Sequence, residues 1–160
     1  KLILKDQLKG IELQRILISI NGIYMRELAL NDVLICDRNP ARITRYRINL
    51  GKSSEDQKCS GLWISTPSGS TAAICSAGGK KMPLSSKRLQ FLVREPYLIK
   101  GKKYRLVHGF IEPGQVLQLV SEMREGYIFI DGPDVSYPLQ FGGTIECKPS
   151  NKPLYVYGIG

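Results

Sequence analysis

Hydrophobic and polar positions alternate along much of the chain with the period of two that a half-buried β-strand requires. The clearest stretch is residues 43–50, where one face is largely apolar and the other is basic or amide-bearing. The first face holds Thr44, Tyr46, Ile48 and Leu50, and the second holds Arg45, Arg47 and Asn49. We therefore expect a strand with one face in the core and one in water.

Similar short runs recur, separated by turn dipeptides such as Asn21-Gly22, Asp131-Gly132 and Gly142-Gly143. Strands are predicted at Leu13–Ile20, Val33–Ile35, Leu62–Ser65, Leu89–Arg94, Tyr104–His108, Val116–Ser121, Tyr127–Asp131, Thr144–Cys147 and Leu154–Tyr157. The polar stretch Lys52–Lys58 is expected to be a loop. Many short strands need a second layer to cover them, so residues 1–160 are predicted to form one mainly β domain, a multi-stranded β-sandwich.

One segment departs from this pattern and predicts a strand, a turn and a short helix. The run reads Ser65-Thr66-Pro67-Ser68-Gly69-Ser70-Thr71-Ala72-Ala73-Ile74-Cys75-Ser76-Ala77-Gly78-Gly79. Ser70 or Thr71 can cap a helix of one to two turns, and Gly78-Gly79 can end it with positive φ. The sandwich is thus expected to carry one short helix after this Ser/Thr/Gly loop.

The loop offers chemistry suited to a nucleotide. Five hydroxyls lie within seven residues, and Gly69 allows the backbone to approach a ligand closely. The free N–H groups of a helix start favour phosphate oxygens, and Ala72 and Ala73 leave room for a flat group. The residues alone fit equally well a Ser/Thr-rich turn that caps its own helix.

Charge and cysteine content narrow the classes of partner. Lys and Arg number 23 against 14 Asp and Glu, a net charge of +9, which favours nucleotides, nucleic acid or an acidic surface. The basic residues around Gly101 are interpreted as a solvated turn. Four dispersed cysteines and a single histidine predict no metal site and fit free thiols in a reducing compartment, the cytoplasm or an organelle. No apolar run approaches the roughly 20 residues of a membrane helix.

Three motifs resemble the NAD kinase family. Gly61-Leu62-Trp63-Ile64-Ser65-Thr66-Pro67-Ser68-Gly69-Ser70-Thr71-Ala72, with Ser76-Ala77-Gly78-Gly79, is similar to the family's G-L-x-x-S-T-P-T/S-G-S/T-T-A core and its A-G-G ending. Ala29-Leu30-Asn31-Asp32-Val33 resembles the A-L-N-E-V motif, and Ile130-Asp131-Gly132 resembles a strand that ends in D-G. The resemblance covers roughly residues 12–147, and the run from Ser76 to Pro96 resembles the plant-type NADH kinases.

The resemblance implies a binding site for NAD or NADH. Asn31, Thr66, Ser68 and Thr71 would hold the adenosine part, and Ala72 would pack beside the ligand. Asp32 would accept hydrogen bonds from the second ribose, although it is one methylene shorter than the family's glutamate. Ser60 stands where many bacterial members have aspartate, which would relax discrimination between NAD⁺ and NADH. Ala73 stands where many members have tyrosine.

The family's G-G-D-G motif is absent from the sequence. The resemblance places it in an N-terminal α/β domain that binds the phosphates of ATP with Mg²⁺, so we expect no catalytic residue and no metal ligand in this chain. Expected partners are that domain of the same parent chain and further copies in a homo-oligomer, without membrane or nucleic acid. The alternative is a stand-alone basic β-domain that binds RNA or DNA, supported by the net charge and by tyrosines near basic residues.

Overall fold

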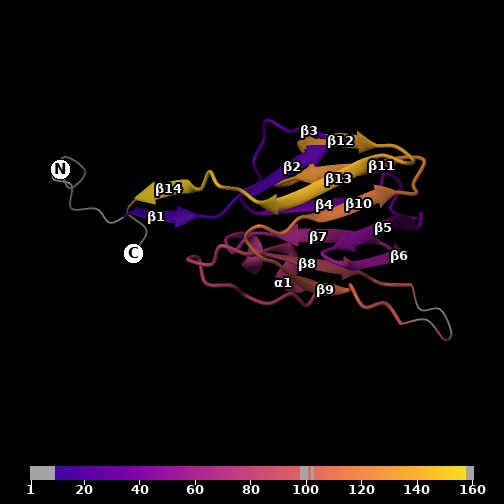
Figure 1. Ribbon diagram of the computed structural model, residues 1–160, viewed down its shortest axis with the longest axis horizontal. Helices are drawn as coiled ribbons and strands as arrows, with labels where there is room; N and C mark the ends of the chain where they lie inside the picture. Colours follow the sequence, from indigo (N-terminus) through magenta and orange to yellow (C-terminus); the bar gives the residue numbers. More distant parts are fainter. Residues whose placement is uncertain (1–9, 98–100, 102, 158–160) are drawn as a thin grey trace.

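Two six-stranded antiparallel sheets pack face to face in the computed structural model, which describes residues 10–97, 101 and 103–157 (Figure 1). Sheet 1 has the order β3 (Ile23–Tyr24), β2 (Ile16–Ile20), β13 (Thr144–Pro149), β10 (Leu117–Ser121), β5 (Thr44–Leu50) and β6 (Ser53–Cys59). Sheet 2 has the order β12 (Val135–Leu139), β11 (Gly126–Ile130), β4 (Asp32–Asp37), β7 (Gly61–Ser65), β8 (Leu89–Arg94) and β9 (His108–Ile111). The expected sandwich is confirmed.

The core lies between the two sheets and consists of the inward-facing residue of each alternating pair. Ile18, Ile48 and Leu119 of sheet 1 are fully buried, as are Ile35 and Ile64 of sheet 2. Strand β5 follows the predicted alternation, with its even-numbered side chains in the core and its arginines exposed. Burial of this apolar surface is the main force that holds the layers together.

The prediction of a loop at Lys52–Lys58 was wrong, because all of this stretch except Lys52 lies in the edge strand β6, which pairs with β5 along its whole length. Gly51, at φ +58°, makes the turn between them. Only one face of an edge strand needs to be buried, and Gln57 and Cys59 supply that face. The polar composition of residues 53–58 is therefore that of a strand at the edge of a sheet.

Other strands differ from prediction in position. The strand expected at Tyr104–His108 begins only at His108, and β12, which carries Pro138 at the edge of sheet 2, was not predicted. Of the basic turn, Lys100 and Lys102 lie outside the described residues, whereas Lys103 and Arg105 are exposed.

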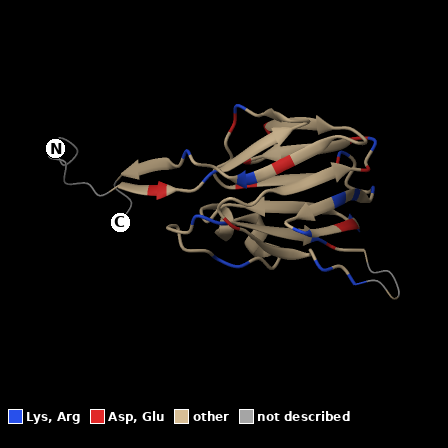
Figure 2. Ribbon diagram, viewed as in Figure 1, with Lys and Arg blue, Asp and Glu red and all other residues tan. Residues whose placement is uncertain are grey.

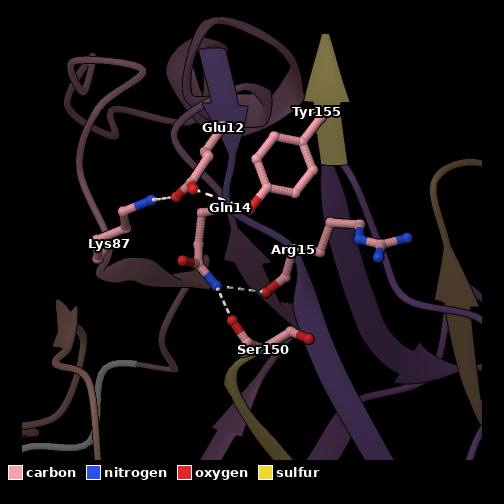
Figure 3. Close-up of polar contacts among 6 residues, drawn as sticks. All are labelled: Glu12, Gln14, Arg15, Lys87, Ser150 and Tyr155. Carbon is pink, nitrogen blue, oxygen red and sulfur yellow. Dashed lines mark hydrogen bonds and ion pairs between the residues drawn. The ribbon is translucent and has the colours of Figure 1, made fainter. Parts of the chain in front are cut away.

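A two-stranded arm, formed by β1 (Gly10–Leu13) and β14 (Leu154–Tyr157), projects from one end of the sandwich (Figure 1). The run predicted as one strand, Leu13–Ile20, is broken between the arm and β2. At the break the amide of Gln14 donates to the carbonyls of Arg15, at 3.0 Å, and Ser150, at 2.8 Å (Figure 3). This buried amide joins the two chain segments where the arm leaves the body.

The short helix expected after the Ser/Thr/Gly loop is present. A 3₁₀ turn at Gly69–Thr71 precedes α1, the four residues Ala73–Ser76. The predicted caps Ser70 and Thr71 were wrong, because Ala72 holds the N-cap position without any side-chain bond. Gly78, at φ +97°, follows the helix end as predicted. Within the described ranges, no helix is long and apolar enough to cross a membrane.

Candidate nucleotide-binding site

The Ser/Thr/Gly loop and the Ala29–Val33 motif are far apart in sequence but lie side by side at one end of sheet 2. Strands β4 and β7 pair in a register that sets Asp32 opposite Ser65. Beyond the ladder, the N–H of Thr66 donates to the carbonyl of Asn31 at 2.9 Å, and the Thr66 hydroxyl donates to the carbonyl of Leu30 at 2.5 Å. The Ser/Thr/Gly loop is thus fastened to the segment that contains Asn31 and Asp32.

The close approach of the loop to the Asn31 segment requires a glycine at position 69. A Cβ at position 69 would lie 2.0 Å from the carbonyl oxygen of Asn31, well inside van der Waals contact. The Gly69 N–H also donates to Oγ1 of Thr66 at 3.1 Å. The sequence suggested that this glycine lets a ligand approach, whereas in the structure it lets two protein backbones approach each other.

Asp131 holds the same segment from the other side. Its carboxylate accepts hydrogen bonds from the N–H groups of Leu30, Asn31 and Asp32 at 2.7, 2.7 and 3.0 Å. The residue stands directly after β11 at φ +52°, a conformation that aspartate tolerates better than most residues. The D-G signature located this residue in the sequence, but nothing local to it predicted contacts with residues 100 positions away.

The hydroxyls of the loop divide into two groups. Three of them bond to backbone carbonyls. The Thr66 hydroxyl donates to Leu30, Ser65 Oγ donates to the carbonyl of Thr66 at 2.9 Å, and Ser70 Oγ donates to the carbonyl of Pro67 at 2.7 Å. Ser68 Oγ is buried and has no hydrogen-bond partner in the described part of the chain. Thr71 is exposed at the end of the 3₁₀ turn. Within the described ranges, Ser68 and Thr71 are therefore the two loop residues whose hydroxyls are left uncommitted.

The remaining predicted residues also face outward from this corner. Asn31 is exposed, and its carboxamide makes no hydrogen bond with the described part of the chain, because its contacts run through its backbone. Ala72 and Ala73 are exposed beside Thr71. Of the six predicted site residues, Asn31, Thr71 and Ala72 are exposed and Ser68 is half-buried, whereas Asp32 is buried. Thr66 is buried and fastens the loop to the Asn31 segment.

Asp32 lies at the mouth of an apolar hollow of about 330 Å³, which is also lined by Leu34, Trp63, Phe129, Gly132 and Pro133. Burial raises the pKa of the Asp32 carboxyl above its ordinary value, and the negative charge of Asp131 raises this pKa further. No donor within the described residues bonds to this carboxylate. It is therefore an acceptor without a partner, placed where the hydroxyls of a sugar could donate to it.

Ser60 does not belong to this corner. It precedes β7, whereas the Ser/Thr/Gly loop follows β7, so the length of a five-residue strand separates them. The Ser60 hydroxyl donates to the carboxylate of Glu95. A carboxylate is therefore already present at this position, which weakens the expectation that Ser60 leaves the region uncharged.

Basic residues are spread over several turns and loops of the described chain (Figure 2). Among the described residues, no group of three or more His, Cys, Asp or Glu side chains could hold a metal ion. All four cysteines are free thiols, and burial raises the pKa of Cys147.

Known proteins share both the sequence and the fold. No protein-family model matches the chain. It is 41% identical to a probable NADH kinase of Oryza sativa subsp. japonica over 149 residues, which cover 89% of this chain and 46% of the relative. The NADH kinase of Arabidopsis thaliana is 42% identical over 62% of this chain and 31% of that protein. An NAD kinase of Methanospirillum hungatei is 31% identical over 91% of this chain and 52% of that protein.

Two solved structures share the architecture. Yeast NADH kinase complexed with NADH superposes with a TM-score of 0.81 at 14% identity, covering 99% of this chain and 49% of the yeast chain. An NAD kinase of Archaeoglobus fulgidus in complex with ATP gives a TM-score of 0.74 at 20% identity, covering 94% of this chain and 55% of that chain. At these identities the likeness establishes the fold. The chain spans about half the length, or less, of these relatives. Over that span, the chain belongs to the NAD kinase family.

Proposed function

We propose that the chain is the acceptor-binding part of an NAD(H) kinase, which phosphorylates the 2′-hydroxyl of the adenosine ribose of NAD or NADH. The observation that carries this proposal is the corner at which the two family motifs meet. There, Asp131 and Thr66 immobilise the backbone. The Asn31 carboxamide, the Ser68 hydroxyl and the Thr71 hydroxyl have no hydrogen-bond partner among the residues that the structure describes.

In this proposal each uncommitted group meets a part of the dinucleotide. The carboxamide of Asn31 can both donate to and accept from the edge of adenine. Ser68 and Thr71 bond oxygens of the adenosine, and Ala72 permits close contact. Asp32 accepts hydrogen bonds from the second ribose, and two such bonds would favour its charged form and so offset the raised pKa of its carboxyl.

ATP with Mg²⁺ is the proposed donor. Phosphoryl transfer depends mainly on positioning and on neutralising charge. We assign those tasks to a G-G-D-G-containing domain in the part of the family's length that this chain does not span. The role of the chain is then to present the ribose hydroxyl, and we expect it to bind NAD(H) without transferring phosphate by itself.

The test follows the fluorescence of Trp63, the only tryptophan of the 160 residues, after circular dichroism has shown that the chain is folded. Titration with NAD⁺ should quench Trp63 saturably, because its ring lines the hollow beside Asp32. Asn31→Ala and Thr71→Ala should each weaken binding by roughly five- to tenfold, the worth of one or two hydrogen bonds. Asn151→Ala, next to the arm, and Ser54→Ala, on the edge strand β6 of the other sheet, are matched controls at exposed positions and should bind as the parent does.

Quenching that is equal in all four variants would show that NAD⁺ binds elsewhere. A folded chain that ignores NAD⁺ and binds a competing oligonucleotide would instead favour the basic-domain alternative. In the whole protein, the same Asn31 and Thr71 variants should lower kcat/KM for the acceptor and leave the KM for ATP unchanged.

A further inference from the structure

A hollow of about 480 Å³ opens at the end of the sandwich that lies opposite the arm (Figure 1). Its two walls are the loop between β4 and β5, residues 38–43, and the turn between β10 and β11, residues 122–125. The arm joins sheet 1 at the start of β2 and the end of β13, whereas the hollow lies at the start of β5 and the end of β10. We call it the arginine hollow, because it is lined by Arg42, Arg45 and Arg124.

Three contacts join the walls of the arginine hollow to each other. The N–H of Arg38 donates to the carbonyl of Glu125 at 2.8 Å, and the guanidinium of Arg42 donates to the carboxylate of Glu125 at 2.7 Å. The N–H of Glu122 donates to the carbonyl of Arg45 at 3.0 Å. Walls that are held in this way need little ordering when a ligand arrives, which lowers the entropic cost of binding.

Two of the three arginines in the hollow are uncommitted. Arg42 is paired across the walls, whereas the guanidinium groups of Arg45 and Arg124 form no ion pair or hydrogen bond within the described residues. Arg47, two residues further along β5, shows the alternative, because Asp56 holds its guanidinium at 2.7 Å. A guanidinium binds a phosphate through two parallel N–H donors, so two free guanidinium groups at one hollow suit a phosphate group.

Carboxylates line the same hollow and restrict what a ligand must carry. Asp37 is only 6% exposed, and its Oδ1 accepts a hydrogen bond from the N–H of Asn39 at 3.0 Å. No donor among the described residues bonds to its Oδ2 or to the carboxylate of Glu122, the second acidic residue of the lining. Buried acceptors are usually satisfied by a donor. The hollow therefore favours a ligand that brings hydrogen-bond donors together with a negative charge, and not an anion alone.

The remaining lining and the size of the hollow agree with a small organic molecule. Met123 is almost fully buried and Ile43 is 40% exposed, so both supply apolar surface against which the carbon atoms of a ligand can pack. The volume of about 480 Å³ falls within the range of small-molecule sites and is far larger than a phosphate ion needs. The hollow thus offers guanidinium groups, carboxylates and an apolar surface to a single ligand.

We propose that the arginine hollow binds a sugar phosphate. The phosphate group lies at Arg45 and Arg124, and hydroxyl groups of the sugar donate to the carboxylates of Asp37 and Glu122. The phosphate neutralises the two free guanidinium groups, and the hydroxyls supply the donors that the carboxylates lack in the described chain. Inorganic phosphate would meet only the arginines, and a neutral sugar would meet only the carboxylates, so neither uses the whole hollow.

The arginine hollow is separate from the candidate nucleotide-binding site. Strand β4 begins at Asp32, beside that site, and ends at Asp37, in the hollow. At a rise of roughly 3.4 Å per residue, these two positions lie roughly 17 Å apart. The hollow is therefore inferred without reference to NAD(H) binding, and its test contains no dinucleotide. A nucleic-acid backbone fits it less well, because successive phosphates would bring negative charge toward both carboxylates.

The test titrates the whole protein with ribose 5-phosphate in a phosphate-free buffer, by isothermal titration calorimetry. The parent should bind saturably, and Arg45→Gln with Arg124→Gln should weaken binding by at least about tenfold, because two charge-assisted contacts with the phosphate are lost. Arg26→Gln with Arg105→Gln is the matched control. It removes the same charge at two exposed positions that do not line the hollow, and it should leave binding unchanged.

A second substitution tests the role of the sugar hydroxyls. Asp37→Asn keeps an oxygen for the Asn39 N–H but removes the negative charge. It should weaken the binding of ribose 5-phosphate by roughly three- to tenfold, because a hydrogen bond to a carboxylate is lost. The same change should strengthen the binding of inorganic phosphate, because it removes a repelling charge. Asn31→Ala with Thr71→Ala should bind both probes as the parent does.

Four results would overturn the proposal. The first is a parent that does not bind ribose 5-phosphate, and the second is an equal loss in the two arginine pairs, which would indicate attraction by net charge alone. The third is an Asp37→Asn variant that changes the binding of both probes in the same direction. The fourth is a loss found in the Asn31 and Thr71 variant and not in the Arg45 and Arg124 variant, which would place the sugar phosphate in the nucleotide-binding site.

Discussion

At the scale of single residues, the candidate site depends on groups that do not touch a ligand as much as on groups that would. Asp131, Thr66 and Gly69 are committed to protein contacts, and their effect is to fix the backbone from which Asn31 and Ser68 project. A binding site needs side chains that are held in position while their polar atoms stay free. Such preorganised groups lose less conformational entropy when the ligand binds.

Replacing Gly69 with alanine should therefore be more harmful than an ordinary glycine substitution. The new Cβ would meet the Asn31 carbonyl at 2.0 Å, and two backbones would have to separate. We expect a loss of at least about 3 kcal/mol in the free energy of unfolding, at the upper end of overpacking effects, measured by urea denaturation. Gly114→Ala, at φ +87° with open space around it, is the control and should cost only about 1 kcal/mol. Equal losses would mean that the loop can shift away from Asn31.

Asp32 predicts a particular dependence of stability on pH. Burial and Asp131 raise the pKa of its carboxyl in the folded chain above the unfolded value of about 3.9. The folded state then holds this proton more tightly, so this group lowers stability as pH rises from about 4 through the folded pKa. Asp32→Asn should remove that loss: the variant should be more stable than the parent at pH 7, and the difference should shrink toward pH 4. Denaturation at several pH values measures this, and a less stable variant at pH 7 would contradict it.

At the scale of elements, the sequence predicted strands where a core face alternates with a solvated face and failed where another signal dominated. Strand β5 is predicted by its own period of two, and β8 and β14 are predicted with the observed bounds. Strand β6 was missed because an edge strand can be polar, and its pairing with β5 depends on a turn at Gly51. The break at Gln14 was missed because Leu13–Ile20 is apolar throughout and only a distant carbonyl, that of Ser150, reveals the junction.

The same reasoning applies to the elements of the site. The loop and the Asn31 segment were each found from local motifs, and the register of β4 with β7 brings them together as the family resemblance implied. The predicted helix caps failed because Ser70 has better partners than a helix end. Its hydroxyl donates to the Pro67 carbonyl and accepts from the Met82 N–H at 2.9 Å, and both contacts depend on the fold.

The arm offers a test confined to one element. Gln14→Leu would keep the volume of the side chain but leave the buried carbonyl of Ser150 without its donor. Amide hydrogens of residues 11–13 and 154–157 should then exchange several-fold faster, whereas those of β5 and β10 should be unchanged, as measured by hydrogen–deuterium exchange mass spectrometry. Glu12→Gln weakens only the exposed contacts with Lys87 and Tyr155 and should have a smaller effect (Figure 3). Faster exchange throughout the sandwich would show that Gln14 supports the whole fold.

At the scale of the whole molecule, the sequence predicted two layers but could not predict how differently their outer faces are built. Leu34, Trp63, Leu92 and Phe129 are scattered over nearly 100 positions, and only the registers of three strand pairs align them. The net charge of +9 is similarly uninformative until the fold separates Arg38 and Arg94 from the aspartates at the other end of sheet 2. This separation of positive from negative charge depends on the strand topology, since each charged residue looks like an ordinary surface residue in its local context.

The paired arm also determines how the described chain would respond to mechanical force. Gly10 lies opposite Tyr157 and Leu13 lies opposite Leu154. Further in, Ile16 lies opposite Pro149, so the same two segments continue as neighbours into sheet 1. A pull that separates residues 10 and 157 would load these hydrogen bonds one pair at a time, as in a zipper, and not all together in shear. Opening would start at the tip of the arm and reach the sandwich only after the Gln14 hydrogen bonds had broken. Under such a pull the arm would therefore separate before the sandwich unfolds.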